Sequence, residues 1–136
     1  MTARSEQRIG PHLGRSEGRV PFFLVGGGPV TGAHAEAWTH YVDGVVPAPE
    51  PVFMVVDLEK MGEGIFEPEA RRQLIDWAFR RGTPLTMAYV NASEGMRTML
   101  LLMQLGSELS GHRPTLNFFA TEAAARSWLA ALGAQF

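Results

Sequence analysis

A glycine-rich stretch could cradle a phosphate group. It runs from Gly26 to Gly32 after an apolar run, and Asp57 ends the next apolar run. In dinucleotide-binding folds such glycines let the backbone approach a pyrophosphate, while the acid binds a ribose. Here Thr31 stands where the third glycine of that pattern belongs, and Pro29 removes one N–H donor. We therefore interpret the stretch as a tight turn, with anion binding kept as the alternative.

Four histidines are candidates for metal binding or acid–base chemistry: His12, His34, His40 and His112. His34 and His40 are six residues apart on one expected helix, so they point to different sides and cannot share a metal ion. His12 and His112 lie in stretches that we expect to be polar loops. A zinc site needs three or four converging ligands, and no spacing here supplies them. We expect all four histidines to be exposed or half-buried, and we predict no metal site.

Four acids crowd the segment after the expected central strand: Glu59, Glu63, Glu67 and Glu69. Paired carboxylates can act as acid and base when their environments separate their pKa values. No nucleophile or base accompanies these acids, however, so we predict no catalytic residue, no cofactor and no enzyme activity. Glu67 and Glu69 suit the positive end of a helix. We retain these two only as a candidate docking edge.

The segment at residues 96–105 is the most apolar helix expected in the chain. Three methionines and one leucine form a stripe at helical spacing, and three further leucines extend the apolar character round most of the helix. A helix that is apolar nearly all round is buried on more than one side, and methionines suit adaptable contacts. A neighbouring loop, another subunit, a lipid or a membrane surface could supply the second cover, and plain core packing is the alternative interpretation. The candidate interaction residues are Met96, Met99, Leu101, Leu102 and Leu105.

These candidates must be positioned by alternating strands and helices. Apolar, β-rich runs predict strands at residues 20–25, 52–56, 85–90 and 116–119, with an additional edge strand considered in residues 7–17. Helical spacing after each run predicts helices that start near Thr31, near Pro68, near Asn91 or Ser93, and near Thr121. We expect Gly106 to end the third helix, and Ala125, Trp128, Leu129 and Leu132 to form the inner face of the last. This order predicts an α/β fold with a central, mostly parallel sheet of four to five strands covered by about four helices.

Length and composition limit the remaining function classes. The 136 residues are 46% hydrophobic and 19% charged, which suits one domain at residues 20–136 behind a polar lead at residues 1–19. The chain has no cysteine, which excludes disulfides and thiol nucleophiles. A net charge of −2 argues against nucleic-acid binding, and no apolar run reaches the roughly 20 residues of a membrane span. The lead has no apolar signal-peptide core, so we expect a cytoplasmic location.

Four stretches resemble the bacterial STAS/SEC14-like domain family, also called the SpoIIAA-like family: residues 8–12, residues 24–38, residues 55–58 with 68–71, and residues 118–129. The last is the most specific, because a strand ending in aromatics precedes Thr-Glu at a helix start and Trp-Leu near the helix end. The resemblance spans nearly the whole chain and implies a single small domain of that fold. Relatives include anti-sigma-factor antagonists, domains attached to anion transporters, and lipid carriers.

One branch of that family carries a phosphate-accepting serine at the helix start that matches residues 66–70 here. This stretch contains neither Ser nor Thr, so we do not carry the phosphorylation switch over. Ser93, at the start of the next helix, remains a candidate acceptor.

The leading hypothesis is a non-enzymatic regulatory or protein-interaction domain of STAS-like fold that docks to itself or to a protein partner. The alternative is a small carrier or sensor of a hydrophobic, lipid-like ligand. The two differ in their interiors. A carrier needs an apolar pocket of roughly a few hundred Å³, whereas a docking domain should be solid.

Overall fold

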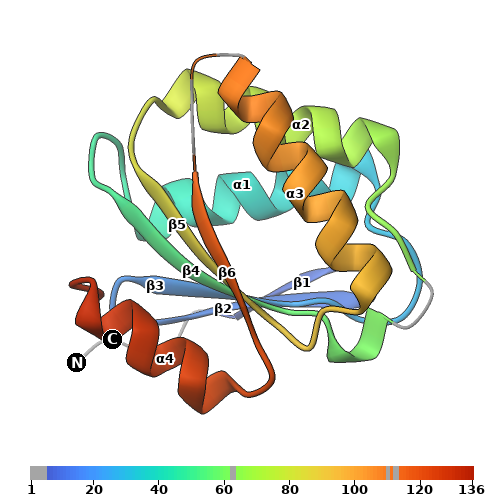
Figure 1. Ribbon diagram of the computed structural model, residues 1–136. Helices are drawn as coiled ribbons and strands as arrows, with labels where there is room; N and C mark the ends of the chain where they lie inside the picture. Colours follow the sequence, from blue (N-terminus) through green and yellow to red (C-terminus); the bar gives the residue numbers. More distant parts are fainter. Residues whose placement is uncertain (1–5, 62–63, 110, 112–113) are drawn as a thin grey trace.

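The computed structural model, which describes residues 6–61, 64–109, 111 and 114–136, is centred on one sheet (Figure 1). In these residues six strands lie in the order β1-β2-β3-β4-β5-β6. Their bounds are β1 (Glu6–Ile9), β2 (His12–Glu17), β3 (Val20–Leu24), β4 (Val52–Asp57), β5 (Leu85–Val90) and β6 (Thr115–Phe119). The first three strands pair antiparallel, and the strands from β3 to β6 pair parallel.

Helices connect the parallel strands. They are α1 (Gly32–Val45), α2 (Pro68–Arg81), α3 (Glu94–Leu109) and, after the last strand, α4 (Glu122–Ala131), with a short 3-10 helix η1 (Glu59–Met61) after β4. Because the strands are ordered as in the sequence, every crossover steps the same way along the sheet. Crossovers of one hand then place their helices on one face. Figure 1 shows α1, α2 and α3 on one face and α4 on the other.

The predicted fold class is confirmed as a single small α/β domain with a mostly parallel sheet and, in the described residues, four helices. The predicted number of strands was too low. Residues 6–17, within the polar lead, form a hairpin of two strands, β1 and β2, rather than one edge strand. Gly10 has a φ of +60° in the hairpin turn, a conformation that glycine adopts without steric penalty. The strands were hard to recognise because their residues are mostly polar or charged.

The core lies on both faces of the sheet. The larger part, beneath α1 to α3, contains Phe23 stacked on Trp38 and Trp38 stacked on Tyr41, with ring centroids 4.6 and 5.7 Å apart. The smaller part, beneath α4, brings Phe22 together with Leu129. Each fully buried side chain of this size stabilises the fold by roughly 1.5–3 kcal/mol. The sheet is therefore covered on both faces, as its apolar central strands predicted.

The helices begin where their capping residues predicted. Thr31 accepts a hydrogen bond from the His34 N–H at 3.2 Å, and Thr121 accepts one from the Ala124 N–H at 3.2 Å. Pro68 is the first residue of α2. Each cap satisfies a backbone donor that the helix itself leaves without a partner.

Two predicted helix ends were wrong. α3 continues through Gly106 to Leu109, because a glycine inside a helix costs only about 1 kcal/mol and this one packs beside Ile75. α4 ends at Ala131, so Leu132 lies beyond the helix and is 49% exposed rather than buried. The extra turn of α3 lengthens the surface that this helix presents.

Candidate functional site

α3 has an inner side that packs and an outer side that does not. Met96 and Leu100 point into the core, and the Ser93 hydroxyl accepts the Met96 N–H at 3.2 Å at the start of the helix. The outer side carries four leucines that are 48%, 62%, 50% and 84% exposed: Leu101, Leu102, Leu105 and Leu109. We call these four residues the α3 leucine face. Single exposed apolar residues are common, but a contiguous row marks an interaction surface.

A groove of about 360 Å³ lies beside this face, between α2 and α3. Its walls are Pro68, Arg71, Arg72, Ile75 and Asp76 from α2 and Met99, Leu102 and Met103 from α3. The Arg71 Nε is buried without a hydrogen-bond partner in the structure. A buried donor of this kind is unfavourable unless a partner group satisfies it. The groove therefore combines apolar side chains of both helices with charged side chains of α2.

The structure divides the predicted interaction residues of α3. Leu101, Leu102 and Leu105 are exposed, as an interaction surface requires, and Met99 is half-buried in the wall of the groove. Met96, which was also a candidate, is 7% exposed and belongs to the core. It lies on the opposite side of the helix from the leucines.

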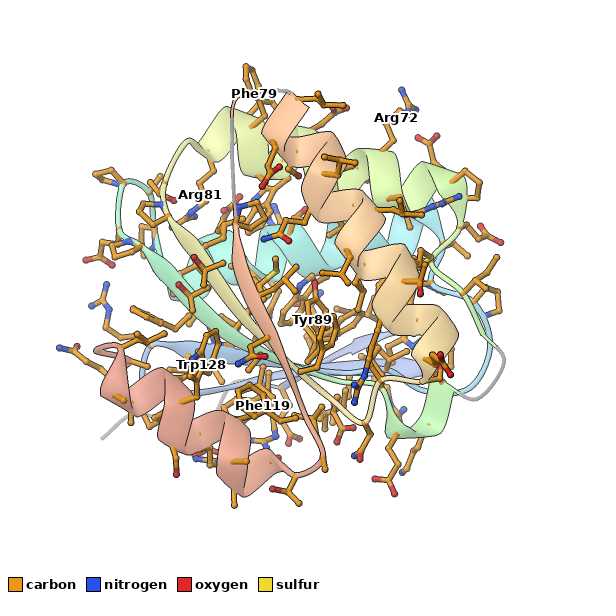
Figure 2. The ribbon with its side chains drawn as sticks, viewed as in Figure 1. Arg72, Phe79, Arg81, Tyr89, Phe119 and Trp128 are labelled. Atoms are coloured by element: carbon orange, nitrogen blue, oxygen red, sulfur yellow. The ribbon has the colours of Figure 1, made fainter. Side chains whose placement is uncertain are left out.

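Two exposed apolar residues of the same layer were missed. Leu109 was lost because the helix was expected to end at Gly106. Phe79, near the end of α2, is 57% exposed, and Figure 2 shows it pointing outward. Phe79 could have been predicted as an exposed apolar residue, because it lies on the polar side of an amphipathic helix.

The acids of the proposed docking edge lie apart from the leucines. Glu67 is the N-cap residue of α2 but makes no capping hydrogen bond through its side chain. Glu69 pairs with Arg72 at 2.5 Å and packs against Gly32 at the start of α1. Neither acid lines the groove. Glu59 is exposed, and Glu63 lies outside the described residues.

A cavity of about 70 Å³ lies between the sheet and the helices α2 and α3. Trp77, Tyr89 and Leu100 are among its lining residues, and Figure 2 shows Tyr89 between the sheet and α3. The Tyr89 hydroxyl donates to the Met87 sulfur at 3.5 Å, and a thioether is a weak acceptor. Burial raises the pKa of Tyr89, so the phenol stays protonated.

His12 is fully buried, which contradicts its expected place in a polar loop. It lies in β2, where the hairpin brings it beside the loop between β3 and α1. The Gly26 N–H donates to His12 Nδ1 at 2.8 Å, so the ring proton is on Nε2, which lies 3.3 Å from the Pro29 carbonyl oxygen. Burial lowers the pKa of His12; the hydrogen bond to the Pro29 carbonyl oxygen partly offsets this effect, and the neighbouring His34 ring adds a smaller lowering. The ring therefore holds the loop in place as a neutral group.

The remaining histidines differ in environment. His34 is half-buried, and its Nδ1 accepts the Thr31 N–H at 3.1 Å, which completes a reciprocal cap at the start of α1. His40 is exposed as predicted, and His112 lies outside the described residues. The rings that meet at the glycine-rich loop thus act as hydrogen-bond acceptors for the backbone.

The glycine-rich loop uses its polar groups within the fold. The Gly26 N–H is bound by His12, and the Val30 N–H donates to the Ile65 carbonyl oxygen at 2.8 Å. The Asp57 carboxylate accepts the Glu59 N–H at 3.0 Å. These contacts support the interpretation of the loop as a structural turn.

Two arginine clusters join elements that are distant in the sequence. Arg81, whose side chain is 2% exposed, donates to the Asp43 carboxylate at 2.8 Å and to the Val46 and Glu50 carbonyl oxygens at 2.6 and 2.8 Å. It ties the end of α2 to the end of α1. Trp77 donates to the same carboxylate at 3.0 Å.

The second cluster fastens α4 to the hairpin. Glu17 accepts hydrogen bonds from Arg126 and Arg15, each at 2.5 Å, and Arg126 also donates to Glu122 at 2.9 Å. The Arg126 hydrogen bond is the main reason that the pKa of Glu17 falls to about 2. Both guanidinium groups lie over the Phe22 ring. These contacts are within the fold and leave the leucine face untouched.

Neither a metal centre nor a membrane span emerges from the described part of the chain. Within it, no three His, Cys, Asp or Glu side chains gather in a group that could hold a metal ion. No helix there is long and apolar enough to cross a membrane.

Comparison of the chain with protein-family models, with curated proteins and with solved structures finds no match. The STAS/SpoIIAA-like assignment therefore stays a prediction from the residues that carry the resemblance. Function must be argued from the surface and the interior of this fold.

Proposed function

We propose that this chain is a non-enzymatic interaction domain of STAS-like fold, which docks a protein partner through the α3 leucine face. The observation that carries the proposal is the exposure of four leucines on one side of one helix: Leu101, Leu102, Leu105 and Leu109. Exposure of such a row to water is unfavourable. Complete burial of a fully exposed leucine is worth roughly 1.5–3 kcal/mol, and these half- to mostly exposed leucines would gain part of it. A partner that covers the face recovers this free energy.

The surroundings of the face favour a protein partner. The groove continues the apolar surface of the leucine face, because Leu102 lines the groove together with Met99 and Met103. Methionine side chains adapt to different partner shapes.

The interior favours docking over the carriage of a lipid-like ligand. The cavity beneath α3 has a volume of about 70 Å³, well below the few hundred Å³ that a carrier requires. The larger hollow, of about 360 Å³, is the groove on the outside. The small size of the interior cavity and the apolar exterior both favour surface recognition.

A photo-crosslinking amino acid at position 102 tests the proposal in cells that produce the protein naturally. We expect ultraviolet light to generate a discrete protein adduct there. The matched control is the same amino acid at position 132, because Leu132 is 49% exposed but belongs to the α4 side of the sheet. A further change, Leu105→Glu, should abolish the adduct at position 102. If positions 102 and 132 give the same adducts, the leucine face is not a docking surface.

A further inference from the structure

Two histidine rings hold the segment that joins β3 to α1. His12 Nδ1 accepts the Gly26 N–H near one end of this segment, and His34 Nδ1 accepts the Thr31 N–H near the other end. A ring nitrogen accepts a hydrogen bond only while it carries no proton. The observed arrangement therefore requires both rings to be neutral.

Protonation would turn both acceptors into donors. The added proton would sit on Nδ1 and face a backbone N–H, and two donors cannot share one hydrogen bond. The two rings also lie edge to face against each other, so two positive charges would repel across that contact. Because His12 is fully buried, its charged form would in addition lose its hydration. The segment can thus accommodate the protons only by opening.

The groups that face the pair do not favour charged rings. Among the described residues, the one charged group that acts on the pKa of His12 is His34, and it lowers that pKa. Phe23 of β3 and Gly10 of the hairpin turn also lie against the rings, and neither titrates. Glu69, the acid of α2 that packs against the start of α1, is already in an ion pair.

We propose that His12 and His34 form a proton-operated latch, which releases the segment at residues 26–31 together with the hairpin turn when both rings are protonated. This inference goes beyond the proposed docking function and does not depend on it. In the open state each ring is exposed to water, where histidine binds a proton near about pH 6.5. The open state therefore holds two protons that the closed state excludes.

The far end of the hairpin stays attached while the turn end opens. A Cβ atom on Gly26 would collide with the Pro11 carbonyl oxygen, so the segment and the turn are in backbone contact and move together. At the other end, Glu17 is held by Arg126 and Arg15. The pKa of Glu17 is about 2, so this cluster remains charged at the pH at which histidine titrates. The opening is therefore local.

The number of protons sets the size of the response. Each proton that only the open state binds raises the opening constant by up to about tenfold per pH unit, so two protons raise it by up to about 100-fold. This increase should appear below about pH 6.5, where exposed histidine becomes charged. At higher pH the opening constant should not change.

Native-state hydrogen exchange, followed by NMR from about pH 7.5 to about pH 5, measures this opening constant at single amides. After correction for intrinsic exchange, the Gly26 and Thr31 amides should show the same rise of up to about 100-fold per pH unit. The Ala124 amide is the matched control, because the Thr121 hydroxyl accepts it at the start of α4 without a histidine. Its opening constant should stay unchanged.

Two variants keep an acceptor but remove a titrating ring. His34→Gln retains the reciprocal cap, because glutamine at this position completes a capping box with Thr31. His12→Asn places an amide oxygen near the position of Nδ1. Either change should reduce the response to about tenfold per pH unit, and both together should abolish it. His40→Gln, at an exposed position on α1, should retain the full response.

Three results would overturn the latch. The first is an opening constant at Gly26 and Thr31 that does not change with pH. The second is an opening constant equal to that of global unfolding in urea, or a matching response at Ala124, since either would assign the protons to unfolding of the whole chain. The third is a full response in His34→Gln, which decides the matter even if His12→Asn does not fold.

Discussion

The imidazole rings of His12 and His34 meet edge to face, with their centroids 4.8 Å apart. Both rings accept backbone N–H groups of the segment that joins β3 to α1, and one of them is fully buried. A Cβ atom on Gly10 would lie 2.4 Å from His34 Nε2, so the hairpin turn closes directly over the pair. The polar lead is therefore part of the fold and is fixed to it through histidine.

This arrangement makes stability depend on pH. The pKa of His12 in the folded chain lies below the ordinary 6.5, so the unfolded chain takes up the proton first as the pH falls. The stabilisation of the fold by neutral His12 is fully present above about pH 6.5, and it declines as the pH falls from there toward the lowered pKa. We expect the urea concentration at which half of the protein is unfolded to decrease as the pH is lowered from 7.5 to 5.5. His12→Phe should lower stability and flatten this slope, whereas His40→Gln, at an exposed position, should retain it.

The Glu17 cluster acts in a more acidic range. The pKa of Glu17 is lowered from 4.5 to about 2, so its contribution is present above pH 4.5 and is lost as the pH falls toward 2. Because its partners are Arg126 and Arg15, Glu17→Gln should cost about 1–2 kcal/mol at pH 7. The difference from wild type should disappear near pH 2. Glu36→Gln serves as the exposed control, and an equal effect of both changes would show that the cluster does not stabilise the fold.

Leu129, more than Trp128, anchors α4. Leu129 is fully buried beneath the helix, whereas Trp128 is half-buried and packs at its edge against Phe119, with ring centroids 5.4 Å apart. Figure 2 shows Trp128 and Phe119 on the α4 side of the sheet. Leu129→Ala should cost about 2–5 kcal/mol and exceed the cost of Trp128→Ala. Chemical denaturation of the two variants decides the order, and a larger loss for Trp128→Ala contradicts this packing.

The sequence predicted best those strands and helices whose signals lie within the element itself. A continuous apolar run predicts the strand β4. Helical spacing of apolar residues between Pro68 and Gly82 predicts the helix α2, which ends at Gly82 with a φ of +65°. Both signals are local. The exposed leucines of α3 were also recognised locally, because too many apolar residues occupy one helix.

The features that could not be predicted from the sequence depend on contacts between residues that are distant in the chain. His12 is buried only because the hairpin places it against Gly26, and no local pattern records that contact. Arg81 looks like a solvated residue at a helix end, yet its guanidinium reaches the end of α1. The length of α3 was underestimated because a glycine signals a helix end unless a neighbour such as Ile75 packs beside it.

The absence of cysteine from the natural chain permits a direct measurement of whether the leucine face is covered. Leu102→Cys and Leu132→Cys each introduce one thiol, at residues that are 62% and 49% exposed on opposite sides of the sheet. Cysteine is itself a small apolar residue, so the face keeps its character. The rate of alkylation of each thiol is measured in the purified protein and again in a lysate of the cells that produce the protein naturally. Covering of the face by a partner predicts that alkylation at position 102 is slower in the lysate while alkylation at position 132 is unchanged. Equal changes at both positions, or no change at either, would contradict it.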